Sequence, residues 1–243
     1  MSPTVHPSAF VGPGVSLGRD VVIGPFASVT GPCQIGDRVW IGPGARLGGP
    51  PEISSLRQNA AWDDDLDHAG VIIADDVVIR ENVVIHQGSH RPTRVGDGCW
   101  LLNSCYLAHD VQLGAAVTIS AGVSIGGHAE IGSYANLGMN AAVHQRRRVG
   151  AGAMIGMSTP VARDIPPYAK VYGAPPRLAD VNAVGLSRRG VPDSVIETLR
   201  ANYLHGTALP TSRGEEWTQV ETDVRWWESL DDPRPVLPLG AGA

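Results

Sequence analysis

The sequence predicts an all-β solenoid plus a small α domain: a left-handed parallel β-helix of hexapeptide repeats with a C-terminal helical domain. Three observations predict it. Through most of residues 1–165 an aliphatic residue returns at every sixth position, the next residue is most often Gly, and a small residue follows four places after the aliphatic one. A period of six fits neither an α-helix nor an isolated strand, whereas it is the repeat of a β-helix whose stacked coils bury a shared core.

The aliphatic series has three runs, and the gaps between them predict two loops. The runs extend from Val5 to Leu47, from Ile73 to Ile85 and from Val95 to Val161. Three repeats complete one triangular coil of about eighteen residues. The first gap predicts a loop at 48–70 and the second a loop at 89–94. Loops that leave a rigid β-helix are where such proteins usually place function, so both are candidate parts of a site.

Beyond residue 165 the pattern changes. A proline-rich stretch begins at about residue 164, and residues 166–243 are predicted to form an extended linker and a C-terminal helical domain. Apolar residues recur on one helical face over 193–204 and again over 214–230. Three cysteines occupy the inward small-residue position of the solenoid, which indicates packing and neither a disulfide nor a metal site. They are Cys33, Cys99 and Cys105.

Composition excludes some classes of function. The formal net charge of -5 argues against a general nucleic-acid or membrane-surface binder. The sequence has no apolar stretch long enough to span a bilayer, and its first residues lack the pattern of a signal peptide. We therefore expect a cytoplasmic protein with no nucleic-acid partner and no membrane span.

Four histidines follow the six-residue period, which predicts a functional site along one edge of the prism. The aliphatic residues that precede them lie three repeats apart, so the histidines are expected on the same side of four successive coils, roughly 5 Å apart. A lone histidine is most often structural, but four in register are not explained by packing. They are His86, His109, His128 and His144.

Two chemistries could use such a column. Imidazole titrates near neutral pH, so a histidine could take a proton from an attacking hydroxyl or amine. Three imidazoles could instead hold a zinc ion, as in the γ-class carbonic anhydrases, which share this fold class. Asp110 directly follows His109 and could orient it. A non-catalytic β-helix that serves as a binding module is a third alternative.

Several motifs together resemble the UDP-N-acetylglucosamine O-acyltransferases of lipid A synthesis. They are IRENVVIHQG (79–88), LAHD (107–110), IGGH (125–128), AVHQ (142–145), DIPPY (164–168) and VNAVGLSRRG (181–190). The resemblance implies an acyltransferase that moves an acyl group from an acyl-carrier-protein or acyl-coenzyme A thioester to a hydroxyl, less readily an amine. By the resemblance His109 is the general base, Asp110 assists it, and the Gly127 N–H stabilises the oxyanion.

The resemblance also implies the rest of the site. A sugar or nucleotide-sugar acceptor would bind in a cleft between neighbouring prisms of a homotrimer. The thioester is the only co-substrate implied, with no cofactor and no metal. The residues implied to line the cleft are His86, His128, His144 and Gln145, together with Tyr106; Asn182, Arg188 and Arg189 would hold nucleotide-sugar or carrier phosphates, and Met157 would line the acyl groove.

Several positions depart from the family pattern. Tyr106 stands where the family has a second histidine, Val184 stands where it has a glutamate, and the 48–70 loop replaces its sugar-binding loop. These departures predict a related sugar or small-molecule acceptor, with UDP-N-acetylglucosamine itself as the alternative. Met157 stands where a glycine leaves room for long chains, which predicts a short or medium acyl group. Arg147 occupies an inward small-residue position, so we expect it to be ion-paired or the coil to deform.

Overall fold

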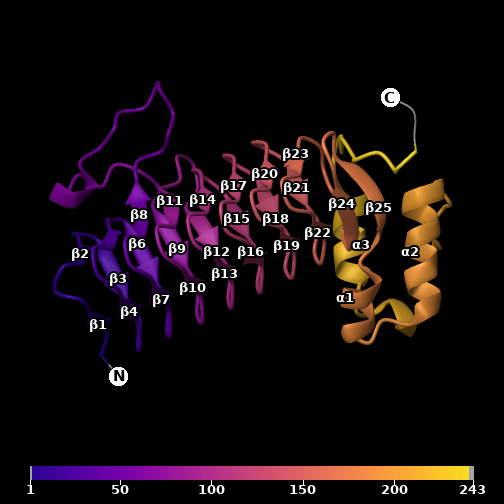
Figure 1. Cartoon of the computed structure of the whole chain (residues 1–243), viewed down its shortest axis with the longest axis horizontal. Coiled ribbons are helices and arrows are strands. Elements are labelled where there is room, and N and C mark those ends of the chain that lie inside the picture. Colours follow the sequence, from indigo (N-terminus) through magenta and orange to yellow (C-terminus); the bar gives the residue numbers. More distant parts are fainter. Residues whose placement is uncertain (1, 241–243) are drawn as a thin grey trace.

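The computed structural model describes residues 2–240 and winds the chain into a three-sided parallel β-helix (Figure 1). Each side is one sheet. Sheet A comprises β1 (Thr4–Val5), β4 (Val22–Ile23), β7 (Trp40–Ile41), β10 (Val78–Ile79), β13 (Trp100–Leu101), β16 (Thr118–Ile119), β19 (Asn136–Leu137), β22 (Met154–Ile155), β24 (Ala169–Tyr172) and β25 (Arg177–Val181). Sheet B comprises β2 (Phe10–Val11), β5 (Ser28–Val29), β8 (Arg46–Gly49), β11 (Val84–His86), β14 (Tyr106–Leu107), β17 (Ser124–Ile125), β20 (Ala142–Val143) and β23 (Pro160–Val161). Sheet C comprises β3 (Val15–Leu17), β6 (Cys33–Ile35), β9 (Val71–Ile73), β12 (Thr93–Val95), β15 (Gln112–Leu113), β18 (Glu130–Ile131) and β21 (Arg148–Val149).

The strand register locates both loops. Within each sheet most strands pair with the strand one coil away, as Trp100 pairs with Thr118. Trp40 and Val78 also pair across one coil but lie further apart in the sequence, because the 48–70 loop intervenes. The same holds for Val78 and Trp100, because the 89–94 loop intervenes. The first loop carries a short 3-10 helix, η1 (Ala61–Asp63). After each loop the chain returns to the next coil in register.

The hydrophobic core fills the inside of the prism. The inward aliphatic residues are almost completely buried, among them Ile23, Ile79 and Ile125. The three cysteines are unpaired and buried in the same core, as predicted. Burial raises the pKa of the Cys105 thiol to about 12, so the thiol stays protonated and acts as an apolar side chain.

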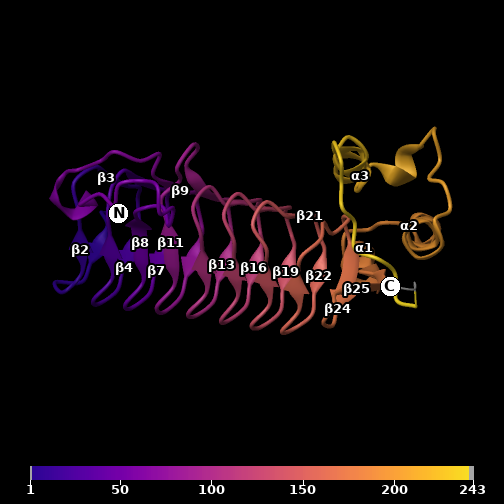
Figure 2. The same ribbon diagram turned by 90° about the horizontal axis from the view of Figure 1, so that it is seen from above.

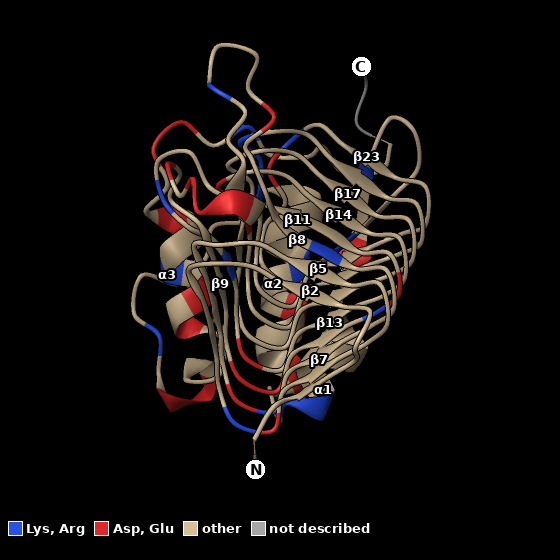
Figure 3. Cartoon of the chain, turned by 90° about the vertical axis from the view of Figure 1, so that its left-hand side faces the viewer, with Lys and Arg blue, Asp and Glu red and all other residues tan. Residues whose placement is uncertain are grey.

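The chain leaves each sheet at a corner, and these corners position the functional residues. We call them the A–B, B–C and C–A corners after the sheets that they join. The C–A corner of the early coils carries an ion-pair ladder in which Arg19 contacts Asp37 and Arg38 contacts Asp76. Figure 3, which looks at the prism from its N-terminal side, shows where acidic and basic residues lie along the ribbon. The B–C corner of the central coils carries the histidine column.

The C-terminal residues cover the far end of the prism (Figure 2). They form α1 (Ala183–Arg188), α2 (Asp193–His205), η2 (Glu215–Trp217) and α3 (Glu221–Glu228), with a second small core around Leu186, Leu199 and Trp217. Residues 166–181 differ from the expected linker: β24 and β25 extend sheet A, with β25 antiparallel. The prolines precede β24 or lie in the turn before β25, where no ladder N–H is required. Within residues 2–240, every helix is too short or too polar to cross a bilayer.

Candidate active site

The B–C corner brings the four predicted histidines onto four neighbouring coils. Strands β11, β14, β17 and β20 are successive neighbours in sheet B, and their inward residues Ile85, Leu107, Ile125 and Val143 are paired in register. The side chains divide into two groups. His109 and His128 lie in contact, whereas His86 and His144 are each held elsewhere.

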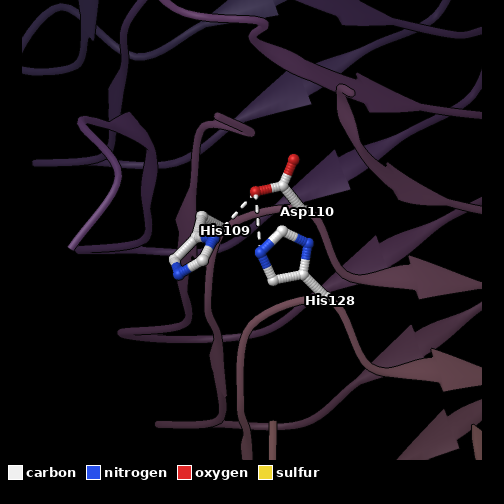
Figure 4. A group of neighbouring side chains, drawn as sticks. All are labelled: His109, Asp110 and His128. Carbon is white, nitrogen blue, oxygen red and sulfur yellow. Dashed lines mark hydrogen bonds and ion pairs between the residues drawn. The ribbon is translucent and has the colours of Figure 1, made fainter. Parts of the chain in front are cut away.

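The central group is a cluster of His90, His109, Asp110 and His128, of which Figure 4 shows the last three. The His109 and His128 rings meet edge to face, with centroids 4.9 Å apart. The His90 ring stacks on the His128 ring, with centroids 5.9 Å apart. Asp110 Oδ2 lies 2.7 Å from His109 Nδ1 and 3.8 Å from His128 Nε2. Two imidazoles, those of His109 and His128, thus face the Asp110 carboxylate, and the His90 ring packs on His128.

Asp110 holds this cluster together through its hydrogen bonds. Its carboxylate is fully buried and accepts hydrogen bonds from the N–H groups of Ser89, His90 and Arg91, from the Ser89 hydroxyl and from His109 Nδ1. Burial alone would raise the pKa of Asp110, but these hydrogen bonds outweigh burial and hold the pKa far below its ordinary value. The carboxylate is therefore ionised at neutral pH.

An ionised Asp110 fixes the tautomer of His109. A carboxylate only accepts hydrogen bonds, so Nδ1 of His109 must carry the proton in the 2.7 Å contact. Nε2 of the neutral ring is then free to accept a proton. Burial, together with the neighbouring cation Arg146, lowers the pKa of His128 despite the opposing effect of Asp110. His128 is therefore predominantly neutral at neutral pH and can also donate or accept.

Gly127 lies against the ring of His109. A Cβ atom on Gly127 would stand 2.6 Å from both Cε1 and Nε2 of that ring, so only glycine fits. Among residues 2–240, the Gly127 N–H donates to no protein acceptor, whereas its carbonyl accepts from the Arg146 N–H. A free N–H next to an unprotonated imidazole nitrogen is the pair of groups that acyl transfer to a hydroxyl requires.

The same cluster has the spacing of a metal site. Ligand atoms of His109, Asp110 and His128 lie within 4.8 Å of one another. However, both oxygens of Asp110 already accept from the backbone of the 89–94 loop, and its contact with Nδ1 directs only Nε2 of His109 outward. The donor arrangement therefore fits proton transfer better than zinc coordination.

The outer histidines have different surroundings. His86 Nδ1 lies 2.7 Å from the Pro50 carbonyl and Nε2 lies 3.7 Å from Glu52, so the 48–70 loop covers this ring. The ring of Tyr106 meets His86 edge to face at 5.6 Å. His144 and Gln145 are exposed, and His144 Nδ1 contacts the Gln145 carbonyl. These residues share the corner with the cluster without touching it.

The remaining predicted site residues lie at other corners. Met157 is 64% exposed in the turn after β22, at the A–B corner. Asn182 caps α1 by accepting from the Gly185 N–H and donates to the Gly152 carbonyl at the C–A corner. Arg189 stacks over Tyr134 at 4.6 Å, also at the C–A corner, while Arg188 is exposed at the end of α1. One chain alone therefore does not bring these residues to His109.

One set of contacts was not anticipated residue by residue. Ser89, His90 and Arg91 supply the hydrogen bonds and the stacking ring around Asp110, although only their loop was predicted. The sequence feature that indicated this loop was the interruption of the six-residue period next to the histidine column. Arg147, the expected misfit, lies 3.5 Å from the buried carboxylate of Asp164 and is ion-paired. Its charge is thus compensated, as the cost of burying a lone guanidinium requires.

We expect Asp110→Asn to loosen the 89–94 loop. In the variant an amide nitrogen would face N–H groups that now donate to a carboxylate oxygen. The loss of these hydrogen bonds should lower the free energy of unfolding by about 3 kcal/mol. Because folding lowers the pKa of Asp110, its contribution to stability is complete above the unfolded pKa of about 3.9 and is lost as pH falls toward the folded pKa. Faster amide exchange at residues 89–91 at pH 7, with a difference in denaturation midpoint that shrinks below about pH 4, would bear this out.

Comparisons with known proteins identify the family of this chain. The family model described as Udp N-acetylglucosamine O-acyltransferase, Domain 2, matches residues 164–208, and the bacterial transferase hexapeptide model matches residues 92–127. An acyl-(acyl-carrier-protein)–UDP-N-acetylglucosamine O-acyltransferase of Bartonella henselae is 37% identical over 233 residues, which cover 90% of this chain and 84% of that protein. The chain belongs to the UDP-N-acetylglucosamine O-acyltransferase family. The correspondingly named protein of Halorhodospira halophila is 35% identical over 82% of both chains.

Solved structures of family members share the fold. A UDP-N-acetylglucosamine acyltransferase from Campylobacter jejuni superposes with a TM-score of 0.76 at 25% identity over 96% of this chain and 99% of its own. One from Bacteroides fragilis gives a TM-score of 0.80 at 24% identity over 96% and 100%, which establishes the fold. The family's solenoid is a left-handed β-helix, so the predicted fold class is confirmed. Membership of the family also makes this chain an acyltransferase.

Proposed function

We propose that this acyltransferase moves an acyl group from an acyl-carrier-protein thioester to a hydroxyl of UDP-N-acetylglucosamine. The single observation that carries the chemistry is the arrangement of His109, Asp110 and Gly127: an oriented base beside a free N–H. The names of the relatives supply the two substrates. This acceptor, the alternative in the sequence analysis, replaces the related sugar or small-molecule acceptor that the departures from the family pattern led us to expect.

The proposed reaction needs no covalent enzyme intermediate, since a thioester is already activated. Nε2 of His109 takes the proton of the acceptor hydroxyl as its oxygen attacks the thioester carbonyl carbon. Asp110 holds the imidazole and stabilises the resulting imidazolium. The Gly127 N–H donates to the developing oxyanion. When the tetrahedral intermediate collapses, the carbon–sulfur bond breaks and the imidazolium returns its proton to the thiolate.

One observation favours a different acceptor, and the same experiment tests it. His86 is covered by the 48–70 loop and packs on Tyr106, so the part of the corner beyond His109 is shaped by residues that depart from the family. We would combine acyl-carrier-protein and coenzyme A thioesters with UDP-N-acetylglucosamine, other nucleotide sugars and free amino sugars, and detect products by mass spectrometry. Efficient turnover of UDP-N-acetylglucosamine supports the proposal. Turnover confined to another acceptor would replace it.

The distribution of residues over corners supports a homotrimer. His109 lies at the B–C corner, Met157 at the A–B corner, and Asn182 and Arg189 at the C–A corner, so one prism presents them in different directions. A threefold assembly would let one protomer's corner complete its neighbour's cleft. Light scattering should give three times the 25.6 kDa chain mass. Mixed trimers of His109→Ala and Arg189→Ala chains should regain activity, whereas separate sites within each chain would leave every mixture inactive.

We expect Met157→Gly to shift the preferred acyl chain toward greater length. The side chain is 64% exposed, so its removal frees space at the A–B corner without disturbing the core. Each additional buried methylene contributes about 0.8 kcal/mol, so the preference should change roughly fourfold per methylene. The measurement is kcat/KM over a series of acyl-carrier-protein thioesters. Met139→Gly, at the same corner one coil away, is the matched control. An unchanged chain profile would show that Met157 does not bound the groove.

A further inference from the structure

A second recess adjoins the histidine cluster. It is a hollow of about 350 Å³ lined by Arg91, His128, Glu130, Arg146, Arg148 and Leu230. His128 belongs to both places, because its ring packs on His109 and also forms a wall of the hollow. Whatever binds in the hollow therefore lies beside the group that we propose as the base.

The hollow is basic, and its arginines differ in whether they form an ion pair. Arg91 contacts Glu130 at 3.0 Å, and Arg148 contacts the buried Asp164 at 3.0 Å. Arg146 has no carboxylate within ion-pair distance among residues 2–240. The chain as a whole carries a net charge of -5, so an uncompensated cation here is not a reflection of a generally basic surface. The guanidinium of Arg146 is therefore available to bind an anion in the hollow.

The backbone places Arg146 directly beside the cluster. Asp110, His128 and Arg146 occupy the same turn position on three successive coils, each with a φ near +60°. The His128 N–H donates to the His109 carbonyl and the Arg146 N–H to the Gly127 carbonyl, which ties each turn to the previous one. Successive coils are about 4.8 Å apart. Arg146 thus lies one coil from His128 and two from Asp110.

We propose that this hollow binds a phosphate group of a substrate, with Arg146 as its principal ligand and Arg91 and Arg148 as its flanks. Guanidinium groups match phosphate oxygens in pairs, and a neutral His128 can donate a further hydrogen bond. The inference rests on the proposed function, whose two substrates both carry phosphate: the diphosphate of the nucleotide sugar and the pantetheine phosphate of the carrier. Glu130 would compete with that phosphate for Arg91.

The first test is binding without turnover. Inorganic phosphate would be titrated at low salt and followed by phosphorus NMR, with circular dichroism to verify folding. Arg146→Gln should weaken binding about tenfold, because a charge-assisted hydrogen bond is lost. Glu130→Gln should strengthen it several-fold, because Arg91 is released and a like charge is removed. Arg19→Gln, an equal change of charge at the N-terminal end of the prism, should have no effect. Unchanged binding by Arg146→Gln, or weaker binding by Glu130→Gln, would overturn the proposal.

The second test identifies the source of the phosphate. In steady-state kinetics Arg146→Gln should raise one KM about tenfold and leave kcat nearly unchanged. A higher KM for the nucleotide sugar assigns the hollow to the acceptor, and a higher KM for the thioester assigns it to the donor. If neither KM changes, the hollow is not a substrate site. Absence of turnover by the wild type would refute the proposed function alone, since the phosphate titration decides the hollow independently.

Discussion

Replacing His109 with alanine is expected to lower kcat by about a thousandfold while the fold and the binding of the acceptor persist. A general base typically contributes 10²- to 10⁴-fold, and the structure holds His109 in a single tautomer through Asp110. The variant loses both the nitrogen that accepts the proton and the orientation that Asp110 gives it. Single-turnover rates with an acyl-carrier-protein thioester, together with acceptor binding by calorimetry, provide the measurement.

The control for this prediction is another histidine. His6→Ala removes an exposed imidazole near the N-terminus, far from the B–C corner of the central coils, and should leave kcat unchanged. Full activity of His109→Ala would contradict the assignment and return the cluster to a structural role. If His109→Ala loses both its activity and its β-sheet circular dichroism spectrum, His109→Gln replaces it as the test variant. Glutamine retains a side chain of similar length and cannot act as the base.

Replacing Gly127 with alanine is expected to lower kcat about a hundredfold with little effect on KM. The new methyl group would lie 2.6 Å from His109 Cε1 and Nε2, well inside contact distance. The imidazole cannot retreat easily, because Asp110 holds Nδ1 and His128 packs on its edge. A displacement of about 1 Å at a reacting group can cost a hundredfold in rate.

The matched control is Gly12→Ala. The nearest neighbour of its methyl group would be the ring edge of Phe10 at 3.0 Å, and that exposed side chain can move. The double variant His109→Ala with Gly127→Ala separates two causes. If Gly127 acts through the position of His109, the double variant should be no slower than His109→Ala alone. A further drop would place the effect on the oxyanion instead.

The sequence was sufficient for the fold and for the positions of the candidate site residues on its coils. A strict six-residue period admits little besides a β-helix, and it places any residue on a known coil and corner. His109, Asp110 and Gly127 could therefore be assigned to one corner before their contacts were known. The C-terminal part was less predictable: β24 and β25 extend sheet A because their partners are supplied by the prism, which local patterning does not record.

The sequence by itself determined which residues stack, because a repeat fixes position along the axis. Only the tertiary structure decided which of them touch. In the structure His109 contacts His128, and His86 contacts the 48–70 loop. His90 packs on His128 from the 89–94 loop, whose conformation the repeat does not predict. The tertiary structure also matched Arg147 with Asp164 and left Arg146 without a carboxylate. Hydrogen bonds and ion pairs depend on side-chain directions at turns and on ejected loops, and the repeat does not specify either.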